Sequence, residues 1–206
     1  MYTPSQFTTN DLSWLDWFAE QFPFGTLISQ VEGAPFATHL PVLYRRENDE
    51  AILTGHWARP NAQWRDIEDQ QVLFMFQGPH AYVSPRWYPE PQKQVPTWNY
   101  VTAHVYGKIR LVHEREELER IVVSLAERFE AGAATPWRLE ANEPNLARLR
   151  GIVGFELRSQ SVQIKLKLNQ NHAAANVEGV IAGLRATGSP EAGAVADLMQ
   201  KELDRR

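Results

Sequence analysis

Apolar and polar residues alternate in short runs over residues 25–112. Glycine, proline, asparagine or aspartate separates the runs, as expected of strand connections. Strands are predicted over 25–31, 36–44, 51–57, 71–78, 80–85 and 97–112. In the last of these, successive residues differ in character, which is typical of a strand with two unlike faces. Six strands joined mostly by hairpins predict a closed or nearly closed antiparallel barrel.

Helical spacing of apolar residues marks the remaining segments of the chain. Helices are predicted over 11–22, 114–132, 143–151, 173–185 and 190–205. The last begins with Ser189 as cap and Pro190 at its first position. Residues 152–159 and 161–170 are predicted to form a hairpin that returns to the sheet. The fold class is therefore mainly β with flanking helices (α+β).

No internal repeat, low-complexity tract or linker divides the chain. Its 206 residues, 43% of them hydrophobic and 7 of them tryptophan, suit one domain with a substantial core. We expect a single domain over 1–206, with 173–206 as a helical C-terminal appendage. The chain has no cysteine, which excludes disulfides and thiolate chemistry. No signal peptide or run of about 20 apolar residues is present, so the expected location is the cytoplasm.

The stretch "ARPNAQW" (58–64) is one candidate phosphate site. Phosphates are held by an arginine or lysine together with backbone N–H groups at a helix start. Arg59, the N–H of Ala58, Asn61 and a helix from about Pro60 would supply these groups. The alternative is an ordinary helix that starts at a proline beside an exposed arginine. Taken alone, this stretch favours the ordinary helix.

A second candidate is the aromatic segment 78–100, which holds five prolines and two tryptophans. Such a stiff, ring-rich segment suits either a planar ligand or a lid packed on the barrel end. Lys165 and Lys167 share one strand face, with Gln170 and Asn171 after them. These four residues could hold a phosphate or a flavin edge, although a solvated strand face is the commoner explanation.

Other common kinds of chemistry lack a motif. The six histidines show no metal-ligand spacing, so no metal site is expected. No serine has a G-x-S-x-G context, and no GxGxxG or Walker sequence is present. Hydrolase, Rossmann and P-loop sites are thereby disfavoured.

The order of the motifs along the chain is more informative about the family than any single motif. The segments "ATHLPVLY", "GHWARPNAQW", "GPHAYVSPRWYP", "VPTWNY…HVYGKIRL" and "IKLKLNQN…GVIAGL" together resemble the PaiB family, from the N-terminus to about Leu184. That family comprises FMN-binding split-barrel proteins described as negative transcriptional regulators. The resemblance implies a six-stranded antiparallel split barrel and a homodimer with FMN at its interface. One departure is Asn169, where the family motif usually has serine.

A wider similarity to split barrels of the pyridoxamine-phosphate-oxidase type implies site residues. One strand and the turn after the next strand would clasp the flavin and its phosphate, through Thr38, His39, Leu40, His56, Ala58, Arg59 and Asn61. The partner subunit's long strand would contribute from near Thr102, with Trp98 and Asn99 just before it. Lys165, Lys167, Gln170 and Asn171 would add contacts from the terminal strand pair.

Three functions remain open at this point. The first is a flavin-binding dimeric regulator, although the net charge of −4 and the absence of a basic stripe do not favour DNA binding. The second is an FMN-dependent oxidoreductase, either a flavin reductase or an enzyme similar to pyridoxamine-phosphate oxidase. Its proton-transfer candidates, by residue type alone, are His39, His56 and His104. The third is a flavin-binding module without turnover.

Overall fold

The computed structural model describes residues 1–140 and 142–206, which form two compact units. The terminal unit consists of Met1–Trp14, Gln77–Ala103 and Gln163–Arg206. The central unit consists of Leu15–Phe76 and His104–Val162. Each unit is assembled from separate stretches of the chain. The organisation of 1–206 as a single domain, with 173–206 as an appendage, stays a prediction.

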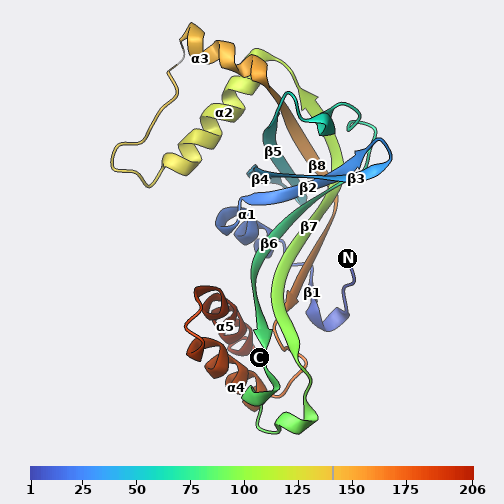
Figure 1. Ribbon diagram of the computed structural model, residues 1–206, viewed down its shortest axis with the longest axis vertical. Helices are drawn as coiled ribbons and strands as arrows, with labels where there is room; N and C mark the ends of the chain where they lie inside the picture. Colours follow the sequence, from blue (N-terminus) through green and yellow to red (C-terminus); the bar gives the residue numbers. More distant parts are fainter. Residues whose placement is uncertain (141) are drawn as a thin grey trace. The chain divides into compact units, whose positions relative to one another are not determined.

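Eight strands form one sheet (Figure 1). They are β1 (Thr8–Thr9), β2 (Phe24–Val31), β3 (Ala34–Pro41), β4 (Leu43–Glu47), β5 (Glu50–Ala58), β6 (Val72–Val83), β7 (Thr97–Val112) and β8 (Ile152–Lys167). Their order is β3-β2-β6-β7-β8-β5-β4, and β1 pairs with β8. The β2–β3, β2–β6, β4–β5, β5–β8 and β1–β8 pairs are antiparallel. The α+β class and the antiparallel sheet are confirmed, with eight strands in place of the expected six. Closure into a split barrel stays a prediction.

Three predicted strand boundaries are wrong. The run 36–44 is two strands, because β3 ends at Pro41 and β4 begins at Leu43 to pair with β5. The runs 71–78 and 80–85 are one strand, β6. The predicted hairpin over 152–170 is also one strand, β8, whose middle residues 158–163 are exposed or half-buried. Polar residues there mark a solvated stretch of strand, which the sequence pattern does not distinguish from a turn.

The central unit has an aromatic and aliphatic core. Leu27, Leu53, Phe74 and Phe155 are fully buried there, and the rings of Trp57 and Phe155 lie 4.6 Å apart. Helix α1 (Ser13–Gln21) begins in the terminal unit and continues into this one. Helix α2 (Arg115–Glu130) buries Leu118, Ile121 and Leu125 against Val112 of β7. After α3 (Glu143–Arg148) and the 3-10 turn η5 (Leu149–Gly151), β8 begins.

The terminal unit holds the last two helices, α4 (Ala174–Ala186) and α5 (Pro190–Leu203), which pack side by side (Figure 1). The predicted cap is confirmed, because Ser189 Oγ accepts the N–H of Ala192 at 3.4 Å. The proline-rich segment forms two 3-10 turns, η3 (Pro85–Trp87) and η4 (Pro91–Lys93). The Trp87 ring lies against Gly183 of α4, which ties this segment to the C-terminal helices.

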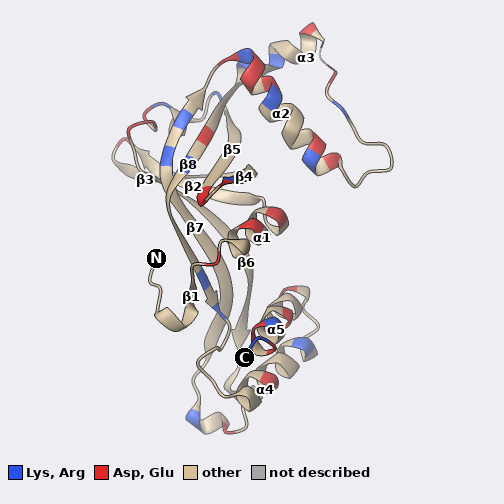
Figure 2. Ribbon diagram, turned by 180° about the vertical axis from the view of Figure 1, so that it is seen from behind, with Lys and Arg blue, Asp and Glu red and all other residues tan. Residues whose placement is uncertain are grey.

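Charged residues of both signs are interspersed along the ribbon (Figure 2). Among the described residues, no helix is both long enough and apolar enough to cross a lipid bilayer.

Candidate functional site

The first group of candidate residues belongs to the central unit and begins on β3. Thr38 pairs with Leu27 of β2 and is half-buried, Leu40 is buried, and His39 between them is exposed. Because side chains alternate along a strand, Thr38 and Leu40 share one face. β3 ends the sheet order, so one of its edges has no strand partner within residues 1–140 and 142–206. Its backbone groups along that edge suit the polar rim of a flat ring.

His56 lies on β5, opposite Gly154 of β8. Its Nδ1 is fully buried, and no hydrogen-bond partner for it occurs among the described residues. Burial lowers the pKa of His56, so the imidazole is neutral at neutral pH. A buried polar atom without a partner is destabilising. Among the atoms of this group, His56 Nδ1 is therefore the one whose burial would be stabilised most by a further hydrogen bond.

Asn61 joins the turn after β5 to β3. Its Nδ2 donates to Thr38 Oγ1 at 3.0 Å, and its Oδ1 accepts the N–H of Gln63 at 2.9 Å. It thereby caps the single 3-10 turn η2 (Ala62–Trp64). The predicted helix from Pro60 is wrong, because the chain forms only this one turn. Asn61 is the cap of this short turn, whereas the sequence predicted a longer helix that starts at Pro60.

Arg59 is exposed, but its guanidinium is held in place. Nε donates to the carbonyl of Arg150 at 2.6 Å, and Nη2 donates to the carbonyl of Ile152 at 2.8 Å. The backbone N–H of Arg59 also donates to the carbonyl of Gly151 at 2.8 Å. The neighbouring Ala58 is exposed, and its carbonyl accepts the N–H of Asn61. Both carbonyl partners of the side chain are neutral, so the charge of Arg59 stays available to an anion.

Gln63 is the residue of this region that sequence reasoning missed. It is fully buried, and its Oε1 accepts from Trp57 Nε1 at 3.1 Å. Its Nε2 lies 3.0 Å from the carbonyl oxygen of Leu27, 3.1 Å from Ser29 Oγ and 3.2 Å from the carbonyl oxygen of Phe36. One amide thus connects β2, β3 and β5 beneath Asn61. No pattern in the sequence could have revealed it, since its partners are far away along the chain.

The second group of candidate residues belongs to the terminal unit and begins on β7. Trp98 is half exposed, and its ring lies 5.8 Å from His80 and 6.2 Å from Tyr82. Thr102 lies on the same face of β7 and is half-buried. Asn99 points from the opposite face and is fully buried, with Nδ2 3.2 Å from Met199 Sδ. Asn99 Oδ1 has no partner among the described residues.

Lys165 and Lys167 follow each other on one face of β8. Lys165 Nζ donates to the carbonyl of Tyr2 at 2.9 Å and lies over the ring of Tyr100 at 5.1 Å. Lys167 Nζ donates to Thr97 Oγ1 at 2.6 Å and to the carbonyl of Trp98 at 2.5 Å. Burial, with the nearby charge of Lys165, lowers the pKa of Lys167. No carboxylate pairs with either lysine in the described part of the chain.

The turn after β8 carries the remaining candidates. Gln170 is bound locally, because its Oε1 accepts the N–H of Leu168 at 2.8 Å and its Nε2 donates to the carbonyl of Leu166 at 2.5 Å. Asn171 is exposed. Asn169 has a φ of 64°, and its Nδ2 donates to Tyr88 Oη at 2.7 Å. Asparagine tolerates this left-handed conformation better than most residues that carry a Cβ.

The structure thus sorts the candidates into two groups. Thr38, His39, Leu40, His56, Ala58, Arg59 and Asn61 form the first group, in the central unit. Trp98, Asn99, Thr102, Lys165, Lys167, Gln170 and Asn171 form the second, in the terminal unit. Direct bonds join Asn61 to Thr38 in the first group and Lys167 to the backbone of Trp98 in the second.

Residues 1–161 match a family described as "Putative FMN-binding domain". The chain belongs to this family. It is 36% identical over 209 residues to "Protease synthase and sporulation protein PAI 2" of Bacillus subtilis (strain 168), with all of both chains covered. The resemblance to the PaiB family is therefore confirmed. An uncharacterized protein of Emericella nidulans, AN0679, is 25% identical, with 98% of this chain and 97% of that protein covered.

Solved structures share the fold of this member of the FMN-binding-domain family. The flavocytochrome Anf3 from Azotobacter vinelandii has a TM-score of 0.60 at 13% identity, covering 78% of this chain and 69% of the other. The FAD and heme binding protein from Mycobacterium smegmatis has a TM-score of 0.56 at 17% identity, covering 85% and 80%. At these identities the likeness extends to the fold alone.

Proposed function

We propose that this protein is a cytoplasmic, FMN-binding homodimer that acts as a regulatory protein. The observation that carries the proposal is the exposed guanidinium of Arg59, which two backbone carbonyls hold and no carboxylate of the described residues neutralises, in the same unit as the bonded pair Thr38 and Asn61. Membership of the FMN-binding-domain family supports FMN as the ligand of this arrangement. The Bacillus subtilis relative is named as a "Protease synthase and sporulation protein", and its link to sporulation supports a regulatory role.

The residues of the first group fit the parts of FMN. The phosphate needs a cation with several donors, which the guanidinium of Arg59 provides. No carboxylate of the described residues forms an ion pair with Arg59, and its side chain bonds to neutral carbonyls. The ribityl hydroxyls need short polar partners, which Thr38 and Asn61 provide. The unpaired strand edge at His39 and Leu40 suits the ring's polar rim.

The second group would complete the site from the other copy in the homodimer. Trp98 offers an exposed ring, Thr102 a hydroxyl, and Lys165 and Lys167 two cations without carboxylate partners in the described chain. When bound, FMN supplies reversible electron uptake. The residues of this chain would hold and orient it, with His56 neutral and able to donate or accept a single hydrogen bond.

Titration with FMN, read by flavin fluorescence and by melting temperature, tests the proposal. Binding should raise the melting temperature as the FMN concentration rises. Arg59→Ala should weaken binding by about 1.5–3 kcal/mol, through loss of a charge-assisted contact to phosphate. Arg65→Ala is the matched control, since it removes an equal charge from an exposed position nearby. A protein that binds no FMN would refute the proposal. Light scattering with and without FMN tests the homodimer.

A second candidate is a flavin-dependent oxidoreductase, because the neutral, half-buried ring of His56 suits a proton-transfer group. Anaerobic mixing of the FMN-loaded protein with NADH or NADPH separates the two functions. Rapid bleaching of the flavin spectrum, lost in His56→Gln, would favour an enzyme. A spectrum that neither nucleotide bleaches would favour the regulatory protein.

A further inference from the structure

A pocket of about 380 Å³ opens on the central unit, at the start of β8. Leu118 of α2, Leu146 of α3 and Leu149 of η5 form its apolar lining. Arg59, Arg115 and Arg150 also line it. The pocket therefore combines an apolar surface with several guanidinium groups. Its volume lies near the lower end of small-molecule sites, which start at about 300 Å³.

The positive charge in this pocket is poorly compensated. Within residues 1–140 and 142–206, no carboxylate forms an ion pair with Arg59 or Arg150. Arg115 lies 3.3 Å from Glu143, whose side chain is 85% exposed, so this pair is weak. Three arginines and one glutamate leave a net charge of about +2 in the lining, in a chain of net charge −4. His113 also lines the pocket.

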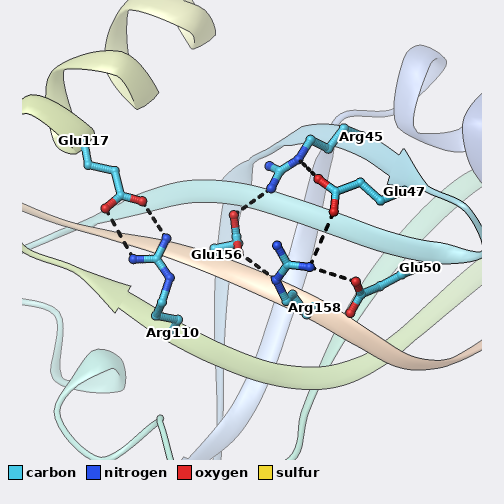
Figure 3. Close-up of polar contacts among 7 residues, drawn as sticks. All are labelled: Arg45, Glu47, Glu50, Arg110, Glu117, Glu156 and Arg158. Atoms are coloured by element: carbon cyan, nitrogen blue, oxygen red, sulfur yellow. Dashed lines mark hydrogen bonds and ion pairs between the residues drawn. The ribbon is translucent and has the colours of Figure 1, made fainter.

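Other arginines of the central unit are paired with carboxylates, unlike Arg59 and Arg150 within the described residues. Arg110 is bonded to both carboxylate oxygens of Glu117, and Arg45 and Arg158 share Glu156 (Figure 3). Those charges are matched by carboxylates at 2.5–3.3 Å. Arg59 differs, because carbonyl groups orient its guanidinium without neutralising it. An anion entering the pocket would meet a cation that is already positioned, which lowers the entropy lost on binding.

We propose that this pocket binds a small organic anion, in which a carboxylate or phosphate is attached to a compact apolar body. The planar guanidinium groups of the arginines would bind the carboxylate or phosphate through paired N–H donors. The leucines would cover the apolar body. This site is additional to the FMN site. Because Arg59 lines this pocket and is also proposed to hold the FMN phosphate, the decisive variant is at Arg150, which is not among the residues proposed for FMN.

Calorimetric titration with phenyl phosphate tests the proposal on the full-length protein. Inorganic phosphate probes the anionic group alone, and benzyl alcohol probes the apolar body alone. Phenyl phosphate should bind more tightly than either. Arg150→Ala should weaken phenyl phosphate binding by about ten-fold or more, as expected for one charge-assisted contact. Arg148→Ala is the matched control, because Arg148 is an exposed arginine of α3 outside the pocket lining.

Equal weakening by Arg148→Ala and Arg150→Ala would show general attraction of anions and overturn the proposal. So would the absence of phenyl phosphate binding to a protein that melts normally. FMN titration of the same variants separates the two sites, since Arg150→Ala should leave FMN affinity unchanged. If phenyl phosphate instead competes with FMN and Arg150→Ala weakens both, the pocket is part of the flavin site. A protein that binds phenyl phosphate but no FMN would refute only the proposed function.

Discussion

At the scale of single residues, the central unit depends on one buried amide. Gln63 satisfies the indole N–H of Trp57 and donates toward the carbonyls of Leu27 and Phe36. Gln63→Ala would remove the acceptor of the buried Trp57 indole N–H and the amide donor near the carbonyls of Leu27 and Phe36. We expect the free energy of unfolding to fall by about 2–4 kcal/mol, measured by urea denaturation. Gln92→Ala, at an exposed position, should change it by less than about 0.5 kcal/mol.

The half-buried His56, whose Nδ1 is fully buried, predicts a pH dependence of stability. Its pKa is lowered by burial in the folded state, whereas the unfolded chain keeps the ordinary value of about 6.5. Below that pH the unfolded state binds a proton that the folded state does not. Stability should therefore rise with pH through this window and fall as the pH drops from about 7 to 5.

Urea unfolding at a series of pH values measures this effect, with His56→Gln as the test variant. The slope of stability against pH should become shallower in His56→Gln. His104 and His172 also have pKa values lowered by burial, so some slope should persist. An unchanged slope in His56→Gln would mean that His56 takes up its proton equally well in both states.

At the scale of elements, the proline-rich segment is held by a close approach to helix α4. A Cβ at Gly183 would overlap the ring of Trp87, and one at Gly179 would overlap its backbone carbonyl. Gly183→Ala should therefore destabilise the protein by about 1–3 kcal/mol through overpacking, as measured by urea denaturation. The effect should shrink when Trp87→Ala is already present, because the overlap is then removed.

Gly193→Ala is a control for the glycine substitution. Gly193 lies inside α5, and the space around it is open. Alanine there should stabilise the helix by about 0.5–1 kcal/mol, since only the helix propensity changes. Destabilisation of equal size at both glycines would contradict the packing argument.

An ion-pair network connects β4, β5 and β8. Glu156 accepts hydrogen bonds from Arg45 at 2.8 Å and Arg158 at 2.9 Å, and Arg158 also pairs with Glu50 at 2.8 Å (Figure 3). Burial alone would raise the pKa of Glu156, but the bonds and charges of the two arginines bring it below its usual value. Its contribution is therefore present above the pKa of the unfolded chain and is lost as the pH falls.

Glu156→Gln should destabilise the protein by about 1 kcal/mol at low salt, since both arginines remain largely solvated. The difference from wild type should decrease as the salt concentration rises. Glu127→Gln on α2 is the control, because Glu127 is exposed and forms no ion pair with the described residues. Thermal melts at two ionic strengths measure both variants. A salt-independent difference would attribute the effect to packing.

The elements were largely predictable wherever a single periodicity ran through a segment. The range predicted for β7, 97–112, is confirmed at both ends, and α2, α4 and α5 lie within about two residues of prediction. In β6, burial falls on even positions up to Gly78 and on odd positions from Pro79. This change of phase at Gly78–Pro79 made one strand resemble two. Partners distant in the chain decide such cases, and a local pattern does not contain them.

The candidate site was predictable to a lesser extent. The motif order predicted the family, and residues such as Thr38 and Asn61 are indeed bonded to each other. The sequence did not reveal Gln63, the neutral carbonyl partners of Arg59, or the pocket beside Arg150. Each depends on groups brought together by the fold, and backbone carbonyls have no sequence signature.

At the scale of the whole molecule, charge argues against general affinity for nucleic acid. The net charge is −4, and acidic residues are interspersed with basic ones along the described chain (Figure 2). We expect a random-sequence DNA duplex to bind more weakly than about 10⁻⁴ M at physiological salt, by fluorescence anisotropy. Tight binding with a steep salt dependence would contradict this. Regulation would then require sequence-specific contacts or another macromolecule.

The residues of the two compact units are also translated at different times. The central unit includes no residue beyond Val162, whereas the terminal unit includes Gln163–Arg206. During synthesis from the N-terminus, the central unit is complete while the last helices are still being translated. The first residues, Met1–Trp14, must wait for partners such as Lys165 of β8. A chain ending at Val162 lacks these partners, so it should expose an unpaired N-terminal segment to proteases and chaperones.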